Sequence, residues 1–225
     1  IFCDTERPVG EGRRTLETIK PNPVQLIATY SPITPKIAIE LPPFLRDIPI
    51  AGEKEYLSVH GALNRLTLYC GSLAKVEKSV VLLPENIRLE SSGKTMNPVK
   101  ELKSWKYLYT LNPAIVQADL FGEVNESLGG KLELYVHEKK YYFFGNKPIL
   151  SPLVQTYKIL AMLPNDSVLI KKELLKLGVG KVILRQKIAP QDYWGERKKY
   201  EEGLKGDKTI HLFVLEKCIL AEEIK

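Results

Sequence analysis

One acidic residue stands where enzymatic chemistry is expected. The first four residues, Ile1 to Asp4, form a short apolar run of strand type that ends in a carboxylate. Open α/β sheets hold their ligands at the carboxyl ends of their strands, so this position would bring Asp4 to a reacting group. Adjacent acidic pairs such as Glu201 and Glu202 are instead expected on solvated ends of elements. Asp4 is therefore the candidate for a catalytic carboxylate.

Basic and aromatic residues gather between positions 181 and 199. This stretch has six basic residues against two acidic ones, with Tyr193 and Trp194 between them. Cations interleaved with exposed rings suit RNA, because phosphates take the charge and unstacked bases can lie on the rings. Alternatively, the two rings pack into the core. The candidate RNA-binding residues are Lys181, Arg185, Lys187, Tyr193, Trp194, Arg197, Lys198 and Lys199.

The sequence offers little for metal or nucleophilic chemistry. Its three cysteines and three histidines are scattered, and no histidine is followed by a second ligand two to four residues later. It contains neither a Gly-x-Ser-x-Gly elbow nor a GxGxxG-like loop. Gly178 and Gly180 follow an expected helix and precede an expected strand, the reverse of the order that aims backbone N–H groups at a phosphate. We expect no metal site.

The composition is that of a folded, basic protein. The chain has 225 residues, is 44% hydrophobic and carries a formal charge of +6, which favours a polyanionic partner. No apolar run approaches the roughly 20 residues of a membrane span, and the N-terminus lacks the pattern of a secretory signal. We therefore expect a cytoplasmic location. The patterning changes near residue 100, which predicts two domains, residues 1–103 and 104–225.

The first domain is predicted to contain a strand, a helix, a strand and a hairpin in that order. Asn22 and Pro23 are typical of a helix cap and first turn, and two alternating runs flank Gly61 as in a β-hairpin. This order is that of the closing half of a doubly wound α/β sheet. The expected elements after Asp4 are a helix ending at Tyr30 and strands at 35–41, 55–60, 63–71, 78–83 and 87–90.

The second domain is predicted to be a smaller α/β domain. The stretch from Tyr157 to Val214 indicates strand, helix, strand, helix, strand. Its first two strands, 157–163 and 181–187, are expected to be parallel neighbours in a βαβ unit.

The residues that lead into this stretch are expected to form a helix and a strand pair. One helix is predicted from Asn112 to Leu128, followed by strands at 131–136 and 140–144. The aromatic run 141–144 could stack bases, but side chains alternate along a strand, which favours a core role for two of the four.

The segment Asp4-Thr5-Glu6-Arg7-Pro8 resembles a known enzyme motif. It is similar to Asp-Pro-x-Arg-Arg at the fourth strand of class I S-adenosylmethionine-dependent methyltransferases that carry a C-terminal THUMP-like domain. Asp4 and Arg7 match this motif, whereas Thr5 and Pro8 depart from it. The resemblance runs over nearly the whole chain. Its other matching segments are 35–38, 41–43, 55–59, 66–71, 107–109, 112–115 and 177–187.

The resemblance implies a division of labour between two domains. The first would be the C-terminal half of the methyltransferase sheet, with Asp4 and Arg7 at the catalytic site. The second, THUMP-like domain would present RNA, with tRNA as a candidate. The Gly-rich turn and the acidic residue that hold S-adenosylmethionine would lie in a missing N-terminal half, upstream of Ile1. We therefore expect this chain alone neither to bind S-adenosylmethionine nor to be active.

Two functions remain open at this point. The first is that the chain is part of an RNA methyltransferase, which the continuous match favours. The second is a catalytically inactive RNA-binding module that carries a decayed methyltransferase half, which the departures at Thr5 and Pro8 favour. A Gly-rich strand-to-helix turn encoded just upstream of Ile1 would separate the two.

Overall fold

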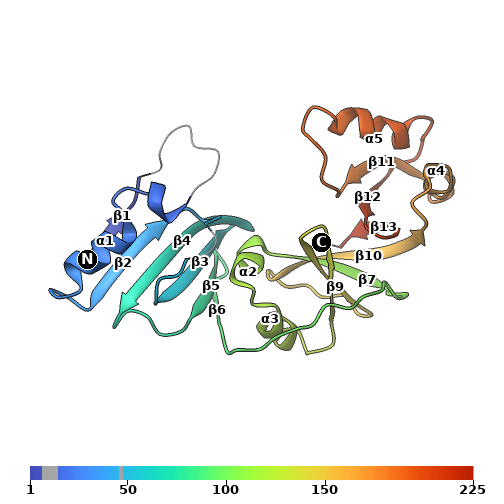
Figure 1. Ribbon diagram of the computed structural model, residues 1–225. Helices are drawn as coiled ribbons and strands as arrows, with labels where there is room; N and C mark the ends of the chain where they lie inside the picture. The colour runs from blue at the N-terminus through green and yellow to red at the C-terminus, as the bar shows by residue number, and fades with distance from the viewer. Residues whose placement is uncertain (7–14, 46–47, 225) are drawn as a thin grey trace. The chain divides into compact units, whose positions relative to one another are not determined.

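The computed structural model describes residues 1–6, 15–45 and 48–224 (Figure 1). In these residues the fold is mixed α/β, with two sheets and five α-helices. The chain forms two compact units, Ile1–Met96 with Asn112–Ser127 and Asn97–Leu111 with Leu128–Lys225. The boundary predicted near residue 103 stays a prediction, because the chain passes between the two units more than once.

The first unit is built on a six-stranded sheet with the order β1-β2-β4-β3-β5-β6. β1 and β2 are parallel and are connected through helix α1, whereas β3 and β4 form an antiparallel hairpin. The strand, helix, strand and hairpin predicted from the sequence are therefore confirmed. The bounds are β1 Phe2–Asp4, α1 Pro23–Tyr30, β2 Lys36–Leu41, β3 Glu53–Val59, β4 Ala62–Gly71, β5 Lys78–Leu83 and β6 Ile87–Glu90, with a 3-10 turn at Leu16–Thr18.

Local chemistry explains the start of α1 and the turn of the hairpin. The Asn22 side chain accepts hydrogen bonds from the backbone N–H groups of Val24 and Gln25, and proline follows it at the first helical position. In the hairpin, His60 and Gly61 both have positive φ, 49° and 76°. Two such residues form the type of turn whose twist matches that of the flanking strands.

The single helix predicted from Asn112 to Leu128 is wrong. The structure has two short helices, α2 (Pro113–Ala118) and α3 (Phe121–Ser127). Asp119 between them takes the left-handed conformation, with φ 57°, and its backbone N–H donates to the Ile115 carbonyl at the end of α2. Aspartate tolerates this conformation better than most residues, and here its carboxylate also pairs with Lys78 at 3.1 Å. The break therefore ends one helix and fixes its end to the sheet.

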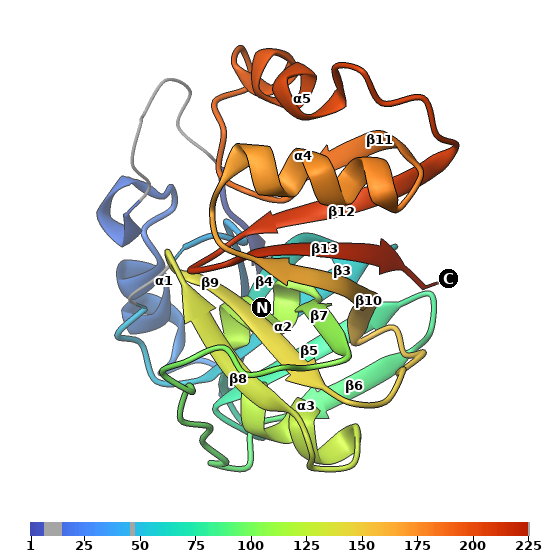
Figure 2. The ribbon, with the colours of Figure 1, turned by 90° about the vertical axis from the view of Figure 1, so that its right-hand side faces the viewer.

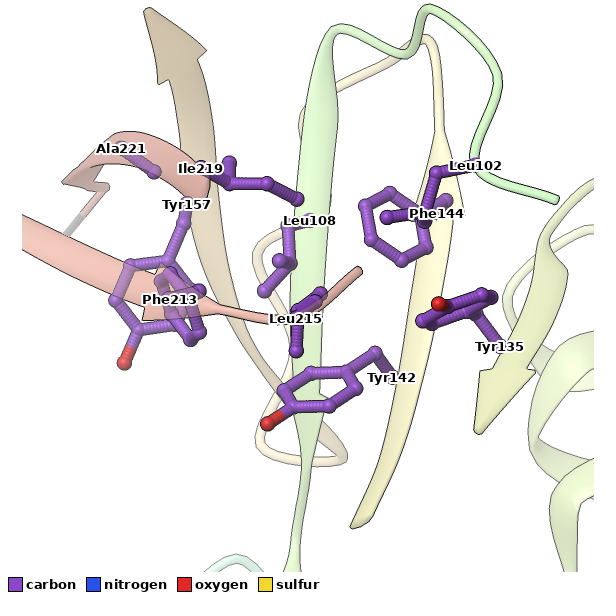
Figure 3. Packing of buried hydrophobic residues seen from close by; sticks show 10 residues of the cluster. All are labelled: Leu102, Leu108, Tyr135, Tyr142, Phe144, Tyr157, Phe213, Leu215, Ile219 and Ala221. Carbon is purple, nitrogen blue, oxygen red and sulfur yellow. The ribbon is translucent and has the colours of Figure 1, made fainter. Parts of the chain in front are cut away.

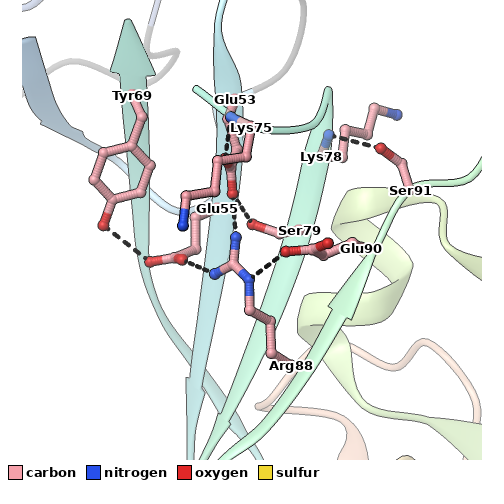
Figure 4. Close-up of polar contacts among 9 residues, drawn as sticks. All are labelled: Glu53, Glu55, Tyr69, Lys75, Lys78, Ser79, Arg88, Glu90 and Ser91. Atoms are coloured by element: carbon pink, nitrogen blue, oxygen red, sulfur yellow. Dashed lines mark hydrogen bonds and ion pairs between the residues drawn. The ribbon is translucent and has the colours of Figure 1, made fainter. Parts of the chain in front are cut away.

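A polar network joins β3, β5 and β6 (Figure 4). Glu53 is 1% exposed, and its carboxylate accepts from Ser79 Oγ at 2.6 Å and from the Lys75 backbone N–H at 3.0 Å. Burial acts to raise the pKa of Glu53, but these bonds and Arg88 outweigh it and hold the pKa below its usual value. The carboxylates paired with Arg88 are those of Glu53, Glu55 and Glu90.

The second unit is built on a seven-stranded sheet with the order β11-β12-β13-β10-β7-β9-β8. Two helices, α4 and α5, lie together at the β11 end of this sheet (Figure 2). The bounds are β7 Tyr107–Leu111, β8 Glu133–His137, β9 Lys140–Gly145, β10 Val154–Leu163, α4 Ser167–Lys176, β11 Val179–Leu184, α5 Tyr193–Glu201, β12 Lys208–Val214 and β13 Cys218–Glu223.

The predicted pairing of the first two strands of this stretch is wrong. The strand, helix, strand, helix, strand order is present, but β12 and β13 lie between β10 and β11. β13 pairs with β10 in antiparallel register, and β12 pairs with β11 in parallel register. The parallel crossover therefore runs through α5, from β11 to β12. A short link after α4 did not decide the pairing, because the closing hairpin β12–β13 supplies both strands with apolar partners.

The two faces of the second sheet carry different cores. On one face, Ile170 and Leu174 of α4 pack with Val182 and Leu184 of β11, and Tyr193 of α5 lies against the same cluster. The other face carries an aromatic core (Figure 3). It consists of Leu102, Leu108, Tyr135, Tyr142, Phe144, Tyr157, Phe213, Leu215, Ile219 and Ala221.

The aromatic run 141–144 belongs to the core, as favoured from the sequence. Tyr142, Phe143 and Phe144 are all buried, one more than the two expected. The reason is that β9 is an inner strand: Phe143 lies opposite the buried Leu134 and Tyr109, while Tyr142 and Phe144 face the aromatic core. These rings are therefore not available to stack on bases.

Among the described residues, no helix is long and apolar enough to cross a membrane.

Candidate functional site

Asp4 ends β1 at an edge of the first sheet. It lies opposite Glu40 in the parallel pairing of β1 with β2, and it is exposed. The next residue, Thr5, is buried, and its hydroxyl donates to the Glu40 carbonyl at 2.6 Å. This bond fixes the backbone just after Asp4, so the carboxylate emerges from a defined strand end. Arg7, the other predicted catalytic residue, lies outside the described residues.

A pocket of about 500 Å³ lies between β1 and α1. One side of β1 has no partner strand in the described part of the sheet, and Phe2 beside the pocket is 63% exposed. An apolar strand with a free edge is a surface on which a sheet can be extended. The pocket is lined by Ile1, Phe2, Cys3, Pro21, Asn22, Gln25, Leu26, Thr29 and Tyr30.

The predicted RNA-binding residues do not share one face of the second sheet. Val182 and Leu184 of β11 pack in the core beneath α4 and α5. Because side chains alternate along a strand, Lys181 and Arg185 point to the opposite face. The residues of α5 therefore lie on the other side of β11 from these two cations. Whether they contact RNA stays a prediction.

One predicted RNA-binding cation, Arg197, binds the carboxylate that attaches helix α5 to the sheet. Arg197 binds Glu201 through Nε and Nη2, both at 2.8 Å, and Glu201 also accepts from the Val182 backbone N–H at 2.7 Å. The Arg197 guanidinium also lies over the Trp194 ring, 5.1 Å from its centroid. Glu201 thus links α5 to β11, and Arg197 holds the Glu201 carboxylate from within the helix, which favours a structural role for Arg197.

The other predicted residues of this stretch differ in how free they are. Lys199 pairs with Glu196 on the helix surface. Tyr193 is partly buried against the core below, whereas Trp194 is 69% exposed. The sequence left two roles open for these rings, packing in the core and contact with RNA. Tyr193 packs against the core, whereas the Trp194 ring is accessible to a ligand. Lys181, Lys187 and Lys198 are exposed.

Replacing Arg197 by Ala is expected to destabilise the second unit by about 1 to 3 kcal/mol, because Glu201 loses its charged partner. Lys198→Ala on the same helix removes the same charge from an exposed site and should change stability by less than about 0.5 kcal/mol. Urea unfolding followed by circular dichroism measures both. Equal stability of the two variants would show that the Arg197 bond to Glu201 does not anchor α5.

The structure also places three residues around Arg185 that the sequence interpretation missed. Arg185 Nε donates to Nδ1 of His211 at 2.9 Å, and its Nη2 donates to the Tyr157 hydroxyl at 3.1 Å. His211 Nε2 lies 3.1 Å from a Glu223 carboxylate oxygen. The one sequence signal for this cluster was a histidine set between apolar residues in a strand, Ile210 and Leu212.

His211 is neutral in this arrangement. A guanidinium can only donate, so Nδ1 must accept and the ring proton lies on Nε2, directed at Glu223. His211 is 3% exposed. Burial, together with the nearby charge of Arg185, lowers the pKa of His211 to about 4, against the opposing effect of Glu223. The imidazole is therefore a fixed acceptor at neutral pH.

Metal chemistry finds no support in the described residues, which contain no group of three or more His, Cys, Asp or Glu side chains that could hold a metal ion. The structure does offer three features. They are the carboxylate of Asp4 at the end of the parallel strand β1, a pocket beside β1 that Ile1, Phe2 and Cys3 help to line, and a positioned guanidinium in the second unit.

Comparison with known proteins finds one solved structure with a similar fold. No family model matches the chain, and no curated protein matches it. A crystal structure described as that of a "putative methyltransferase from Porphyromonas gingivalis W83" is similar over 100% of this chain, with a TM-score of 0.70 and 15% sequence identity. The chain spans 59% of the length of that protein. The fold is thus methyltransferase-like, and identity this low carries no more than the fold.

Proposed function

We propose that the chain is part of an S-adenosylmethionine-dependent methyltransferase that acts on RNA, with tRNA as the first substrate to test. In this proposal the first unit is the closing half of a doubly wound methyltransferase sheet, and the second is a THUMP-like unit that presents the RNA. The observation that carries it is the fold likeness over the whole chain. The exposed Asp4 at the end of a parallel strand supports the placement of the reaction.

The described residues do not by themselves fit S-adenosylmethionine. Such a site needs a Gly-rich turn between a strand and a helix, and in the described part of the first unit the one strand-to-helix passage between parallel strands is that from β1 to α1. The glycines of this passage, Gly10 and Gly12, lie outside the described residues, and the sequence contains no GxGxxG-like loop. The free edge of β1 and the apolar pocket beside it are where further strands would complete the sheet. We propose that the cofactor is held largely by such strands.

A second function keeps a specific observation in its favour. Thr5 departs from the family motif, and its hydroxyl is engaged with the backbone of β2 rather than directed at the strand end. This arrangement is compatible with an inactive module that retains the sheet and binds RNA through its second unit. Activity of the longer protein decides between the two.

Replacing Asp4 by Asn in the longer protein is expected to lower methyl transfer to bulk tRNA by about 100-fold or more, because a positioned proton acceptor at the reacting group is lost. Glu6→Gln is the matched control, since it removes an exposed carboxylate two residues away and should leave the rate unchanged. Transfer of a radiolabelled methyl group measures both.

Two results would contradict parts of this proposal, the first the role of Asp4 and the second the enzymatic activity. Parental activity of the Asp4→Asn variant would make Asp4 a structural residue. Absence of methyl transfer by the longer protein, together with salt-sensitive tRNA binding, would favour the inactive module. Calorimetric titration with S-adenosylmethionine adds a separate check: residues 1–225 should give no saturable heat, and micromolar binding would show that this chain already contains the cofactor site.

A further inference from the structure

Arg185 differs from the other arginines that the structure describes. Four arginines lie in the described residues, and three of them form ion pairs with carboxylates. Arg65 pairs with Glu40, Arg88 with three glutamates, and Arg197 with Glu201. Within the described part of the chain, Arg185 has no carboxylate at ion-pair distance. Its charge is therefore not neutralised by a direct partner.

The Arg185 guanidinium is nevertheless held in place. Its two hydrogen-bond acceptors are both neutral, the imidazole of His211 and the hydroxyl of Tyr157. The guanidinium carbon also lies 5.7 Å from the centre of the Tyr157 ring, a cation–π distance. His211 and Tyr157 are 3% and 2% exposed, so both supports are rigid parts of the core. The Glu223 carboxylate is directed at the far nitrogen of His211, Nε2, at 3.1 Å.

This geometry leaves some N–H groups of the Arg185 guanidinium without an acceptor among the described residues. A guanidinium has five N–H groups, and the bonds to His211 and Tyr157 use two of them. The remaining three belong to an exposed residue that directly follows β11, an edge strand of the sheet that ends at Leu184. Two N–H groups in a fixed fork match the two oxygens of a phosphate, and prior fixing of the fork reduces the entropy lost on binding.

The surroundings of Arg185 favour a polyanion with repeated phosphates. Lys181 precedes it on the same face of β11, and Lys187 follows it just beyond the strand; both are exposed. At about 3.3 Å per residue, Lys181 lies roughly 13 Å from Arg185 along the strand. Lys181 and the fixed guanidinium therefore lie on one face at this edge of the sheet, and Lys187 adds a third cation two residues after Arg185.

We propose that Arg185, positioned by His211 and Tyr157, is a phosphate-binding site of the second unit, and that the phosphate it takes belongs to an RNA backbone. This inference deepens the proposed function, on which its choice of RNA rests. Lys181 and Lys187 extend the site along β11. His211 and Tyr157 are positioning residues, because they act on the ligand through the guanidinium.

The test compares RNA binding by the whole chain and its variants at several salt concentrations, with bulk tRNA as the probe. Arg185→Gln should weaken binding about 10- to 100-fold, and it should lower the slope of log affinity against log salt by about 0.7 to 0.9. Arg185→Lys keeps the charge but loses the fork, so its affinity should fall while its slope stays unchanged. Tyr157→Phe should behave like Arg185→Lys, because only a support of the fork is removed.

Controls separate the possible outcomes. Arg65→Gln makes the same charge change in the first unit and should bind tRNA like the unsubstituted chain. If Arg185→Gln binds as tightly as Arg65→Gln, the inference is wrong while the proposed function stands. Absence of tRNA binding by the unsubstituted chain would overturn both the RNA part of the proposed function and the inference. Arg185-dependent binding to anionic phospholipid vesicles but not to tRNA would overturn the choice of RNA.

Discussion

Replacing Arg88 by Met is expected to destabilise the first unit by about 3 kcal/mol, at the low end of the range for breaking a buried ion pair. The substitution leaves the carboxylate of Glu53, which is 1% exposed, without its cationic partner. Glu55 on the same strand loses its pair as well, so two like charges then face each other without compensation. Arg88 is itself about one third exposed, and for this reason water can replace part of what is lost.

Hydrogen exchange measured on peptides from β3 and β5 would detect the loss of stability in the first unit. Both tryptophans of the chain, Trp105 and Trp194, belong to the second unit, so their fluorescence serves as an internal control that should not change. Arg65→Met provides a matched variant, because Arg65 is 45% exposed and has Glu40 as its one carboxylate partner among the described residues, and ion pairs at the surface contribute about 0 to 1 kcal/mol. If Arg88→Met loses no more protection than Arg65→Met, the network does not stabilise the sheet.

Elements with local signals were predictable from the sequence. The Asn22-Pro23 cap and the hairpin turn act within a few residues; the cap is where the sequence placed it, and the turn, at His60-Gly61, lies one residue before the predicted Gly61-Ala62. The position of β11 was not predictable in this way. Its neighbour in the sheet is β12, which follows after a helix, and β13 then separates this pair from β10. Which apolar strands pair depends on the whole set of strands, and local periodicity does not contain that information.

The candidate sites show the same limit. Charge and spacing selected Arg185, but its partners Tyr157 and His211 are 28 and 26 residues away. Arg197 was selected on the same grounds, yet it pairs with Glu201 four residues later on α5. Counting charges could not separate these two arginines. What separates them is whether a carboxylate lies within reach, a property of the folded chain.

The stability of the second unit is expected to fall as the pH drops from about 6.5 to about 4, because of His211. Its pKa is about 4 in the folded chain and 6.5 for an unperturbed histidine, so between these values the unfolded chain binds more protons than the folded one. The contribution is therefore complete above pH 6.5 and is lost by pH 4, by up to about 3 kcal/mol. Protonation would also remove the acceptor that Nδ1 offers to Arg185, whereas Glu223 faces the other nitrogen and opposes the effect.

A variant without the titrating ring isolates this contribution. His211→Asn can keep an acceptor near the position of Nδ1 while removing the proton site, so its stability should depend less on pH in this window even if it is lower throughout. Urea unfolding at pH 7, 5.5 and 4.5, followed by the fluorescence of Trp105, which packs against the same aromatic core, measures the difference. Equal pH dependence of the two would mean that His211 does not titrate in this window, and that the bond to Arg185 does not depend on its protonation.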